Sequence, residues 1–492
     1  MGACSEEAQP QYNITLLVVP GQTPLATATS VSLEAVGAGM QTTVPVTLGQ
    51  APALLLSKLD PRKTNAATFV VKVNGPQGLL AYGQSPRIRL VRATGDLFIT
   101  VQAPGTLAPI SITSLIPPLA DGAVITALAG EASDPHPIAV PLFLGGRTID
   151  PANDTEQNTR WIGLFNPYLN VASVPNLLTP TAMGAVVWPR NDGKVWSFGG
   201  KTDVEPFVYG GIASELGTSQ TLSNIGFGIV ANYGTNDSFG VRRASAVIAE
   251  KDGIMFAFGG ENADNENKSS SPLASVVEIN PTTTPDKTVR LGSLPMLAPR
   301  IGHTATTISV ALPMPHTEVL LFGGTGTAAP VAEVMSDGAF IALGDDAGPS
   351  RSGHTVIPLP DGRLLILGGV GADGTPMADT RIYDPSTRLF LLAPLQLKVP
   401  RARAAIFAVA NDLVVCGGID PAGALVPSAE RFDLLTLEPL PALVATARSG
   451  AKVAYLPDGT AMLVGGRAPD AKGVRPTSLI EVYRPRDVPK VL

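Results

Sequence analysis

The chain repeats a short apolar run that ends in a pair of glycines. Seven copies occur, at residues 142–146, 195–200, 255–260, 320–324, 365–369, 414–418 and 462–466. The first glycines of successive pairs, at 145, 199, 259, 323, 368, 417 and 465, are 45 to 64 residues apart. This period, with loop insertions allowed, is typical of repeats that each form one small sheet.

Each repeat carries further strand and turn signals. An Asp-Gly pair stands five residues before the glycine pair in four copies, at Asp192, Asp252, Asp361 and Asp458. Asp-Gly favours a tight turn with positive φ, so it predicts a hairpin between a first and a second strand. A third apolar strand follows, as in 277–281 or 381–385, and then a fourth. Four strands per repeat are expected.

These repeats resemble the kelch family. The best copy runs from Arg351 and His354 through Gly368-Gly369 to Tyr383-Asp384-Pro385, with Phe390 where the family has Trp. The resemblance implies an all-β, seven-bladed kelch-like β-propeller over residues 106–492. The outer strands of blade two cannot be placed, and most blades lack the Trp. The last repeat has no fourth strand of its own, so the segment 109–119 is expected to complete it and close the ring.

The first hundred residues have no glycine pair. Strands are predicted at 12–19, 29–36, 42–48, 67–73, 87–91 and 96–101, which favours a small Ig-like β-sandwich over 12–104. We expect it to act as a spacer, with carbohydrate or protein binding as the alternative.

Charge and cysteine content narrow the class of protein. The net charge is −6 and no Lys/Arg run occurs, so no nucleic-acid partner is expected. No apolar stretch approaches 18 residues, so no membrane-spanning helix is predicted. Of the two cysteines, Cys416 lies in an apolar run and is expected to be buried. Cys4 follows small residues and resembles the lipidated cysteine of a bacterial lipoprotein, with residues 1–11 as leader and tether; an incidental cysteine is the alternative.

A recurrent arginine precedes five glycine pairs. These repeat arginines are Arg243, Arg300, Arg351, Arg401 and Arg448. If these arginines point toward one mouth of the central channel of the expected propeller, they form an anion-binding ring. The alternative, which we prefer, is structural pairing with glutamates that recur on third strands: Glu278, Glu333, Glu430 and Glu481.

A long insertion gives a second candidate binding surface. The chain spends 43 residues between Gly200 and Arg243, against 30 between Gly418 and Arg448. Aromatic residues in the insertion, Phe207, Tyr209 and Tyr233 among them, suit glycan or peptide contact; packing of a degenerate blade is the alternative.

The histidines favour structure over catalysis. His303 and His354 occupy the same repeat position, as a packing role requires, while His136 and His316 fall in first-to-second-strand loops. No metal site or cofactor is predicted. We therefore expect a non-catalytic, lipid-anchored protein of the bacterial envelope that presents a propeller face to a protein or polysaccharide partner, with the membrane reached only through Cys4. The alternative is a carbohydrate-active propeller enzyme, either copper-radical-oxidase-like or a sugar lyase or isomerase.

Overall fold

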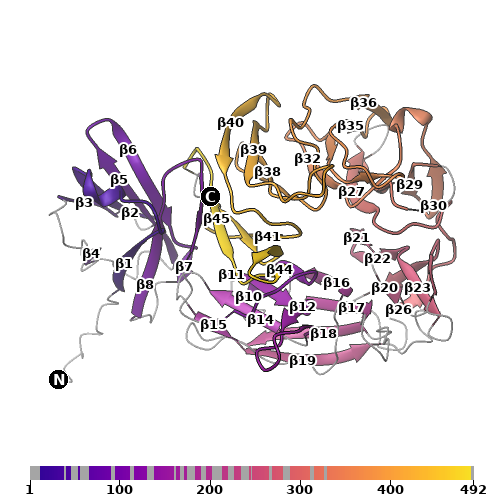
Figure 1. Cartoon of the computed structure of the whole chain (residues 1–492), viewed down its shortest axis with the longest axis horizontal. Coiled ribbons are helices and arrows are strands. Elements are labelled where there is room, and N and C mark those ends of the chain that lie inside the picture. Colours follow the sequence, from indigo (N-terminus) through magenta and orange to yellow (C-terminus); the bar gives the residue numbers. More distant parts are fainter. Residues whose placement is uncertain are drawn as a thin grey trace, which may run out of the picture.

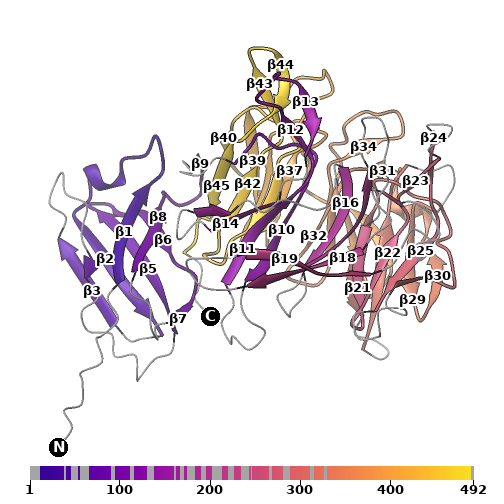
Figure 2. The same cartoon turned by 90° about the horizontal axis from the view of Figure 1, so that it is seen from below.

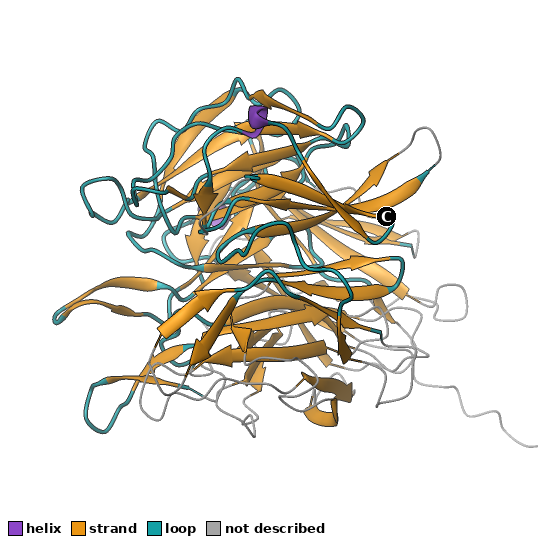
Figure 3. Ribbon diagram, turned by 90° about the vertical axis from the view of Figure 1, so that its right-hand side faces the viewer, coloured by secondary structure: helices purple, strands orange, loops and turns teal. Residues whose placement is uncertain are grey.

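The structure is a computed structural model of the 492-residue chain, and the regular secondary structure of its described part is almost entirely β-strand (Figure 3). It describes residues 12–37, 40–45, 54–55, 66–89, 95–110, 116–129, 138–159, 162–166, 171–173, 183–189, 195–201, 213–219, 226–233, 243–244, 247–264, 269–280, 289–310, 315–325 and 330–488. Two 3-10 turns, η1 (Pro24–Ala26) and η3 (Asp345–Ala347), are the helical elements in these ranges. No helix there is long and apolar enough to cross a membrane.

Seven antiparallel four-stranded sheets make up the larger part of the described chain. We number them in chain order and give their strands in hydrogen-bonded order. Sheet 1 contains β10 (Ala123–Ala129), β11 (Ile138–Leu144), β14 (Ile162–Asn166) and β15 (Val171–Ser173). Sheet 2 contains β16 (Met183–Pro189), β17 (Val195–Lys201), β18 (Ala213–Ser219) and β19 (Gly226–Tyr233). Sheet 3 contains β21 (Val247–Lys251), β22 (Ile254–Phe258), β25 (Val276–Ile279) and β26 (Val289–Leu291).

The remaining four sheets follow the same order. Sheet 4 contains β27 (Thr304–Val310), β28 (His316–Phe322), β29 (Ala332–Ser336) and β30 (Ala339–Ala342). Sheet 5 contains β32 (Thr355–Pro358), β33 (Leu364–Leu367), β35 (Arg381–Asp384) and β36 (Leu389–Leu392). Sheet 6 contains β37 (Ala405–Val409), β38 (Asp412–Cys416), β39 (Ser428–Asp433) and β40 (Pro439–Val444). Sheet 7 contains β41 (Lys452–Tyr455), β42 (Ala461–Val464), β45 (Ile480–Arg484) and β9 (Thr106–Pro109).

The sheets lie side by side around a common centre (Figure 1). The first strand of each contacts the first strand of the next, from β10 through β16, β21, β27, β32 and β37 to β41, and β41 contacts β10 in turn. The fourth strand of sheet 7 comes from the other end of the chain, because β9 pairs with β45 from Thr106 opposite Arg484 to Pro109 opposite Glu481. A strand from before the first repeat was expected here, but it lies earlier than the predicted segment 109–119. Ile116 and Leu119 of that segment pack instead into the apolar core between sheets 7 and 1.

The glycine pairs join neighbouring sheets through backbone hydrogen bonds. In three pairs the second glycine donates its N–H to the carbonyl of the next repeat arginine at 2.8 to 2.9 Å: Gly260 to Arg300, Gly324 to Arg351 and Gly418 to Arg448. Gly466 donates in the same way to Leu119, at 2.8 Å. Both glycines have positive φ in the pairs 145–146, 259–260, 323–324, 368–369, 417–418 and 465–466, and a Cβ at Gly465 would lie 2.3 Å from the Leu119 carbonyl oxygen. Leu119 therefore occupies the repeat-arginine position of sheet 1.

An N-terminal unit of two sheets precedes the repeats. One sheet contains β4 (Leu54–Leu55), β1 (Tyr12–Val18) and β8 (Gly95–Val101); the other contains β3 (Met40–Pro45), β2 (Ser30–Val36), β5 (Ala66–Gly75) and β6 (Gly78–Gln84), with β7 (Ile88–Arg89) paired to β5. Side chains of both sheets share one core, which includes Ile14, Val31, Phe69 and Ile99. The sequence interpretation missed β6, whose Gly83 admits close approach of β8: a Cβ there would meet the Thr100 carbonyl oxygen at 2.3 Å.

Buried polar contacts fix this unit against sheet 7. The Tyr82 hydroxyl donates to the Pro485 carbonyl at 2.9 Å, and the Gln84 amide donates to the Asp458 carbonyl at 2.6 Å. The Arg484 guanidinium lies 4.9 Å from the centre of the Tyr82 ring. The N-terminal unit thus packs directly beside the strand pair β45–β9.

Two turn predictions need correction. Asp252-Gly253 forms the expected two-residue turn, with both residues at positive φ. The loops that contain Asp361-Gly362 and Asp458-Gly459 are longer than two residues, and in each of these pairs only the glycine has positive φ.

Sheet 2, whose outer strands could not be placed from sequence, has β18 and β19 in those positions.

Candidate functional site

Three repeat arginines are buried in ion pairs with third-strand glutamates, as the structural alternative predicts. Arg300 Nε lies 3.0 Å from Glu333 Oε1, Arg401 Nη2 lies 2.5 Å from Glu430 Oε1, and Arg448 Nη2 lies 2.7 Å from Glu481 Oε2. Each guanidinium also donates to the carbonyl of the first glycine of its own sheet's pair: Gly323, Gly417 and Gly465. The glutamates in turn accept backbone N–H groups of the linkers that enter their sheets, at Leu297, Lys398 and Thr446. The predicted anion ring is therefore not favoured for these residues.

The pairing pattern departs from the prediction at Arg351, and the predicted pair of Arg243 with Glu278 lies outside the described side chains. Arg351 pairs with Asp379 at 2.8 Å, because Arg381 stands where sheets 4, 6 and 7 have glutamate. Glu278 lies opposite Phe256, one residue out of register with Glu333, which lies opposite Leu321. Arg243 begins β20 (Arg243–Ala244), and its side chain lies outside the described part.

The aromatic insertion lies largely outside the described residues. Phe207 and Tyr209 are not among them, and Tyr233 ends β19 with its side chain undescribed. His136 and Cys4 are likewise outside, and His316 begins β28 rather than lying in a loop.

The two repeat histidines are buried. Burial, with the positive charges of Arg300 and Arg351 respectively, lowers the pKa of His303 and of His354 to about 3. His354 Nε2 lies 2.9 Å from the Thr304 hydroxyl of the preceding sheet. Val247 holds in sheet 3 the register position that Thr304 holds in sheet 4, and the ring nitrogens of His303 have no hydrogen-bond partner among the described residues. Both rings are packed between sheets, against Gly259 and Gly323 of the preceding glycine pairs, as a packing role requires.

Cys416 behaves as the sequence predicted. Its side chain is 2% exposed, and burial raises the pKa of its thiol to about 12. The described residues contain no group of three His, Cys, Asp or Glu side chains placed to share a metal ion.

Hairpins that follow the glycine pairs project from one side of the sheets, which we call the hairpin face. They are β12 (Arg147–Ile149) with β13 (Glu156–Asn158), β43 (Arg467–Asp470) with β44 (Gly473–Pro476), and β23 (Glu261–Asp264) with β24 (Ser269–Pro272), to which β20 adds. The short pair β31 (Arg351–Ser352) and β34 (Val370–Gly371) lies on the same side. The β12–β13 and β43–β44 hairpins rise next to each other above sheets 1 and 7 (Figure 2).

The base of these two hairpins carries an unusual pair of residues. The position two residues after the repeat arginine has positive φ in all five described repeats: Asp121, Gly302, Gly353, Arg403 and Gly450. Three of the five are glycine. A side chain in the left-handed region costs of order 1 kcal/mol, and such strain concentrates at functional positions. Asp121 and Arg403, at the base of the β12–β13 and β43–β44 hairpins, are therefore candidate functional residues of the hairpin face.

Asp121 and Arg403 belong to a charge network at the contact between sheets 7 and 1, which we call the seam. Arg403 Nη2 donates to Asp121 Oδ1, and Arg467 Nη2 donates to Asp121 Oδ2 at 2.9 Å. Arg467 also reaches Glu156 at 2.5 Å, and Glu156 lies 2.5 Å from Arg147. Burial alone would raise the pKa of Asp121, but hydrogen bonds and charges of Arg467 and Arg403 hold it below its ordinary value.

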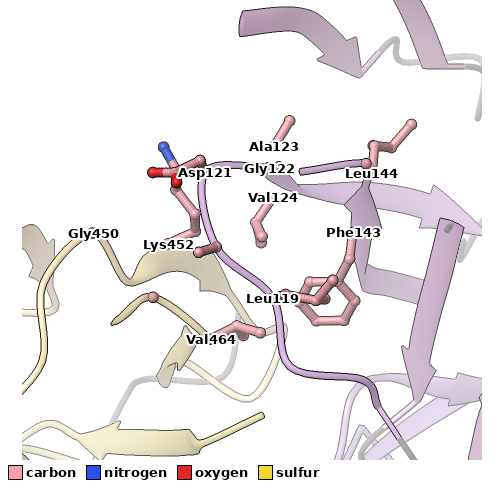
Figure 4. Close-up of a pocket in the computed structure, with 13 residues that line it drawn as sticks. Leu119, Asp121, Gly122, Ala123, Val124, Phe143, Leu144, Gly450, Lys452 and Val464 are labelled. Carbon is pink, nitrogen blue, oxygen red and sulfur yellow. The ribbon is translucent and has the colours of Figure 1, made fainter. Parts of the chain in front are cut away.

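Lys452 completes the seam. It is an exposed residue at the start of β41 that points toward Asp121 (Figure 4). Desolvation of the ammonium by the surrounding protein lowers the pKa of Lys452. The charge of Asp121 raises this pKa, and the charge of Arg403 lowers it further. Beneath these charges, Leu119, Val124, Phe143 and Val464 leave a pocket of about 20 Å³, room for one water molecule.

The sequence interpretation missed the seam residues because they come from different repeats. Only alignment of the positions two residues after the repeat arginines, and after Leu119 in sheet 1, shows Asp121 and Arg403 where three other repeats have Gly. No known family model matches the chain, and no curated protein is significantly similar to it in sequence.

Proposed function

We propose that the chain is a seven-bladed kelch-like β-propeller behind an Ig-like β-sandwich, and that it is a non-catalytic binding or scaffold protein whose hairpin face receives a protein or polysaccharide partner. The contacts of the first strands from β10 round to β41, and the pairing of β9 with β45, support a closed ring. In such a ring each sheet is one blade, and β9 closes the ring as the fourth strand of the last blade.

One observation carries the binding role. Asp121 and Arg403 accept a left-handed backbone at positions where glycine is otherwise used, and they place charged groups together at the base of two projecting hairpins. Exposed polar groups on loops above a rigid scaffold are a common arrangement for recognition. Most other buried charges described in the repeats are used in ion pairs that hold the sheets together.

A shortened hairpin tests this role. Residues 468–475 are replaced by Asn-Gly, which joins the paired residues Arg467 and Pro476 by a two-residue turn. The full chain and this variant are screened against immobilised envelope glycans and envelope protein extracts. We expect wild type to retain a partner that the variant loses. Arg363→Ala, at the opposite end of sheet 5, is the control that should retain it. Equal retention by all three proteins contradicts the role of the hairpin face.

The rival function is a carbohydrate-active propeller enzyme, of copper-radical-oxidase or sugar lyase or isomerase type. It predicts that a captured oligosaccharide changes mass or structure during incubation, with or without added copper. An unchanged mass spectrum and NMR spectrum support the binding role, and a converted ligand overturns it.

Attachment to a bacterial envelope through a lipid at Cys4 is part of the proposal. Expression of the complete gene in a bacterium, with and without Cys4→Ala, tests it. The expected result is loss of the protein from the membrane fraction in the variant, and equal membrane association of both contradicts the anchor.

A further inference from the structure

Positive charge exceeds negative charge at the seam. The network holds the cations Arg147, Arg403, Lys452 and Arg467, and the two carboxylates Asp121 and Glu156. The hairpin tips carry three carboxylates, Asp150, Asp154 and Asp470, and two cations, Lys472 and Arg475, and Asp154 and Asp470 are engaged by these cations. Among the described residues of the seam and the two hairpins, an excess of one positive charge therefore remains, in a chain of net charge −6.

Two of the seam cations have donors to spare. Arg403 uses one amino group on Asp121, and its side chain is 49% exposed. The Lys452 ammonium makes no ion pair or hydrogen bond with another described residue, although it carries three donors. Gly450 leaves room for Arg403: a Cβ there would lie 3.2 Å from Arg403 Nη2, so the guanidinium lies directly over this glycine, two residues before Lys452.

Resting on the binding role proposed above, we infer that Arg403 and Lys452 form the subsite for the anionic group of an acidic polysaccharide. A carboxylate or sulfate placed between them accepts charge-assisted hydrogen bonds from both and offsets the excess charge. Asp121 holds Arg403 in place and does not contact the ligand.

The packing beneath the subsite favours a sugar chain over a peptide. Protein partners bind mainly through apolar or aromatic anchors that fill pockets. Below the seam, Leu119, Phe143 and Val464 leave about 20 Å³, too little for any anchor side chain. A polar polymer with regularly spaced anionic groups needs no such pocket, and the paired hairpins offer it a wall along one side.

Lys452→Gln is the test variant, because it removes a charge that no described ion pair uses. Arg403→Gln is the second variant, and Arg363→Gln, an exposed arginine paired with Asp361 on the opposite face, is the matched control. Binding of the full chain to oligogalacturonate, dextran sulfate, neutral dextran and poly-L-glutamate is measured by calorimetry at 50 and 200 mM salt, with melting curves to check folding.

We expect wild type to bind one or both acidic polysaccharides, more weakly at high salt, and not to bind neutral dextran. Lys452→Gln and Arg403→Gln should each weaken binding about tenfold or more, and Arg363→Gln should not change it. The oligogalacturonate and dextran sulfate arms separate a carboxylate from a sulfate ligand. Equal affinity of wild type and Lys452→Gln overturns the subsite. Poly-L-glutamate bound as tightly as the polysaccharides overturns the ligand class. Binding of neutral dextran alone overturns the anion subsite while the binding role stands; if no polymer binds, the inference falls and the partner screen decides the binding role separately.

Discussion

Arg448→Met removes one member of a buried ion pair without changing the length of the side chain much. Arg448 is 1% exposed and Glu481 is 3% exposed. The substitution leaves the Glu481 carboxylate without its cation and leaves the carbonyls of Gly465 and Leu479 without the donor they share. Loss of one partner of a buried pair costs about 3 to 5 kcal/mol, so we expect a loss of about 3 kcal/mol or more in the free energy of unfolding.

Urea denaturation followed by fluorescence and circular dichroism measures this loss. Arg363→Met is the matched control, because its pair with Asp361 is 39% and 49% exposed, and exposed pairs contribute at most about 1 kcal/mol. The double variant Arg448→Met/Glu481→Leu should be more stable than the sum of its single substitutions predicts, because no uncompensated charge remains. Unfolding curves for Arg448→Met that overlay wild type, or additive effects in the double variant, would refute the pairing account.

Three further predictions concern the contacts between sheets. His303 and His354 have pKa values of about 3 in the folded chain and about 6.5 when unfolding exposes them. Below pH 6.5 the unfolded chain therefore binds protons that the folded chain does not. The free energy of unfolding should fall by about 2 kcal/mol per ring as the pH is lowered from 6.5 to 5. His303→Leu should remove about half of that dependence, and an unchanged slope in urea titrations would contradict it. Gly465→Val places a β-carbon 2.3 Å from the Leu119 carbonyl at positive φ, so little folded protein should form; a melting curve like that of wild type would show that the close approach is wrong. Val247→Thr should give His303 the hydroxyl partner that Thr304 gives His354 and raise stability by about 1 kcal/mol, whereas a loss of stability would count against the shared geometry.

The repeat and its internal contacts could be predicted from sequence because each repeat solves the same packing problem. The apolar runs mark second strands, and the repeat arginines and third-strand glutamates mark their pairs. Where a repeat departs from the pattern, prediction failed for a local reason. Asp379 replaces a glutamate as the partner of Arg351, because Arg381 stands at the glutamate position. This change does not alter the apolar pattern from which the strands were read.

The seam could not be predicted because it joins parts of the chain that are adjacent only in space. Asp121 lies before the first repeat strand, and Arg403, Lys452 and Arg467 belong to the last two repeats. The closing strand shows the same limit. Residues 109–119 carry an apolar and proline-rich pattern that suits a fourth strand, yet β9 is Thr106–Pro109, and Ile116 and Leu119 fill the core at the seam. Apolar periodicity indicates burial but does not say which partner a segment meets.

Closure of the ring is the claim on which the seam and its subsite depend, and an engineered disulfide tests it most directly. Ala108 on β9 lies opposite Val482 on β45, and both are buried. Opposed residues of antiparallel strands have Cα atoms about 4.5 to 5.5 Å apart, within the range that a disulfide spans. In a background with Cys4→Ser and Cys416→Ala, the pair Ala108→Cys and Val482→Cys should form a disulfide under mild oxidation, shown by intact mass and by a higher melting temperature that reduction reverses. Two free thiols that label readily in the folded protein would contradict closure by β9, and with it the seam between sheets 7 and 1.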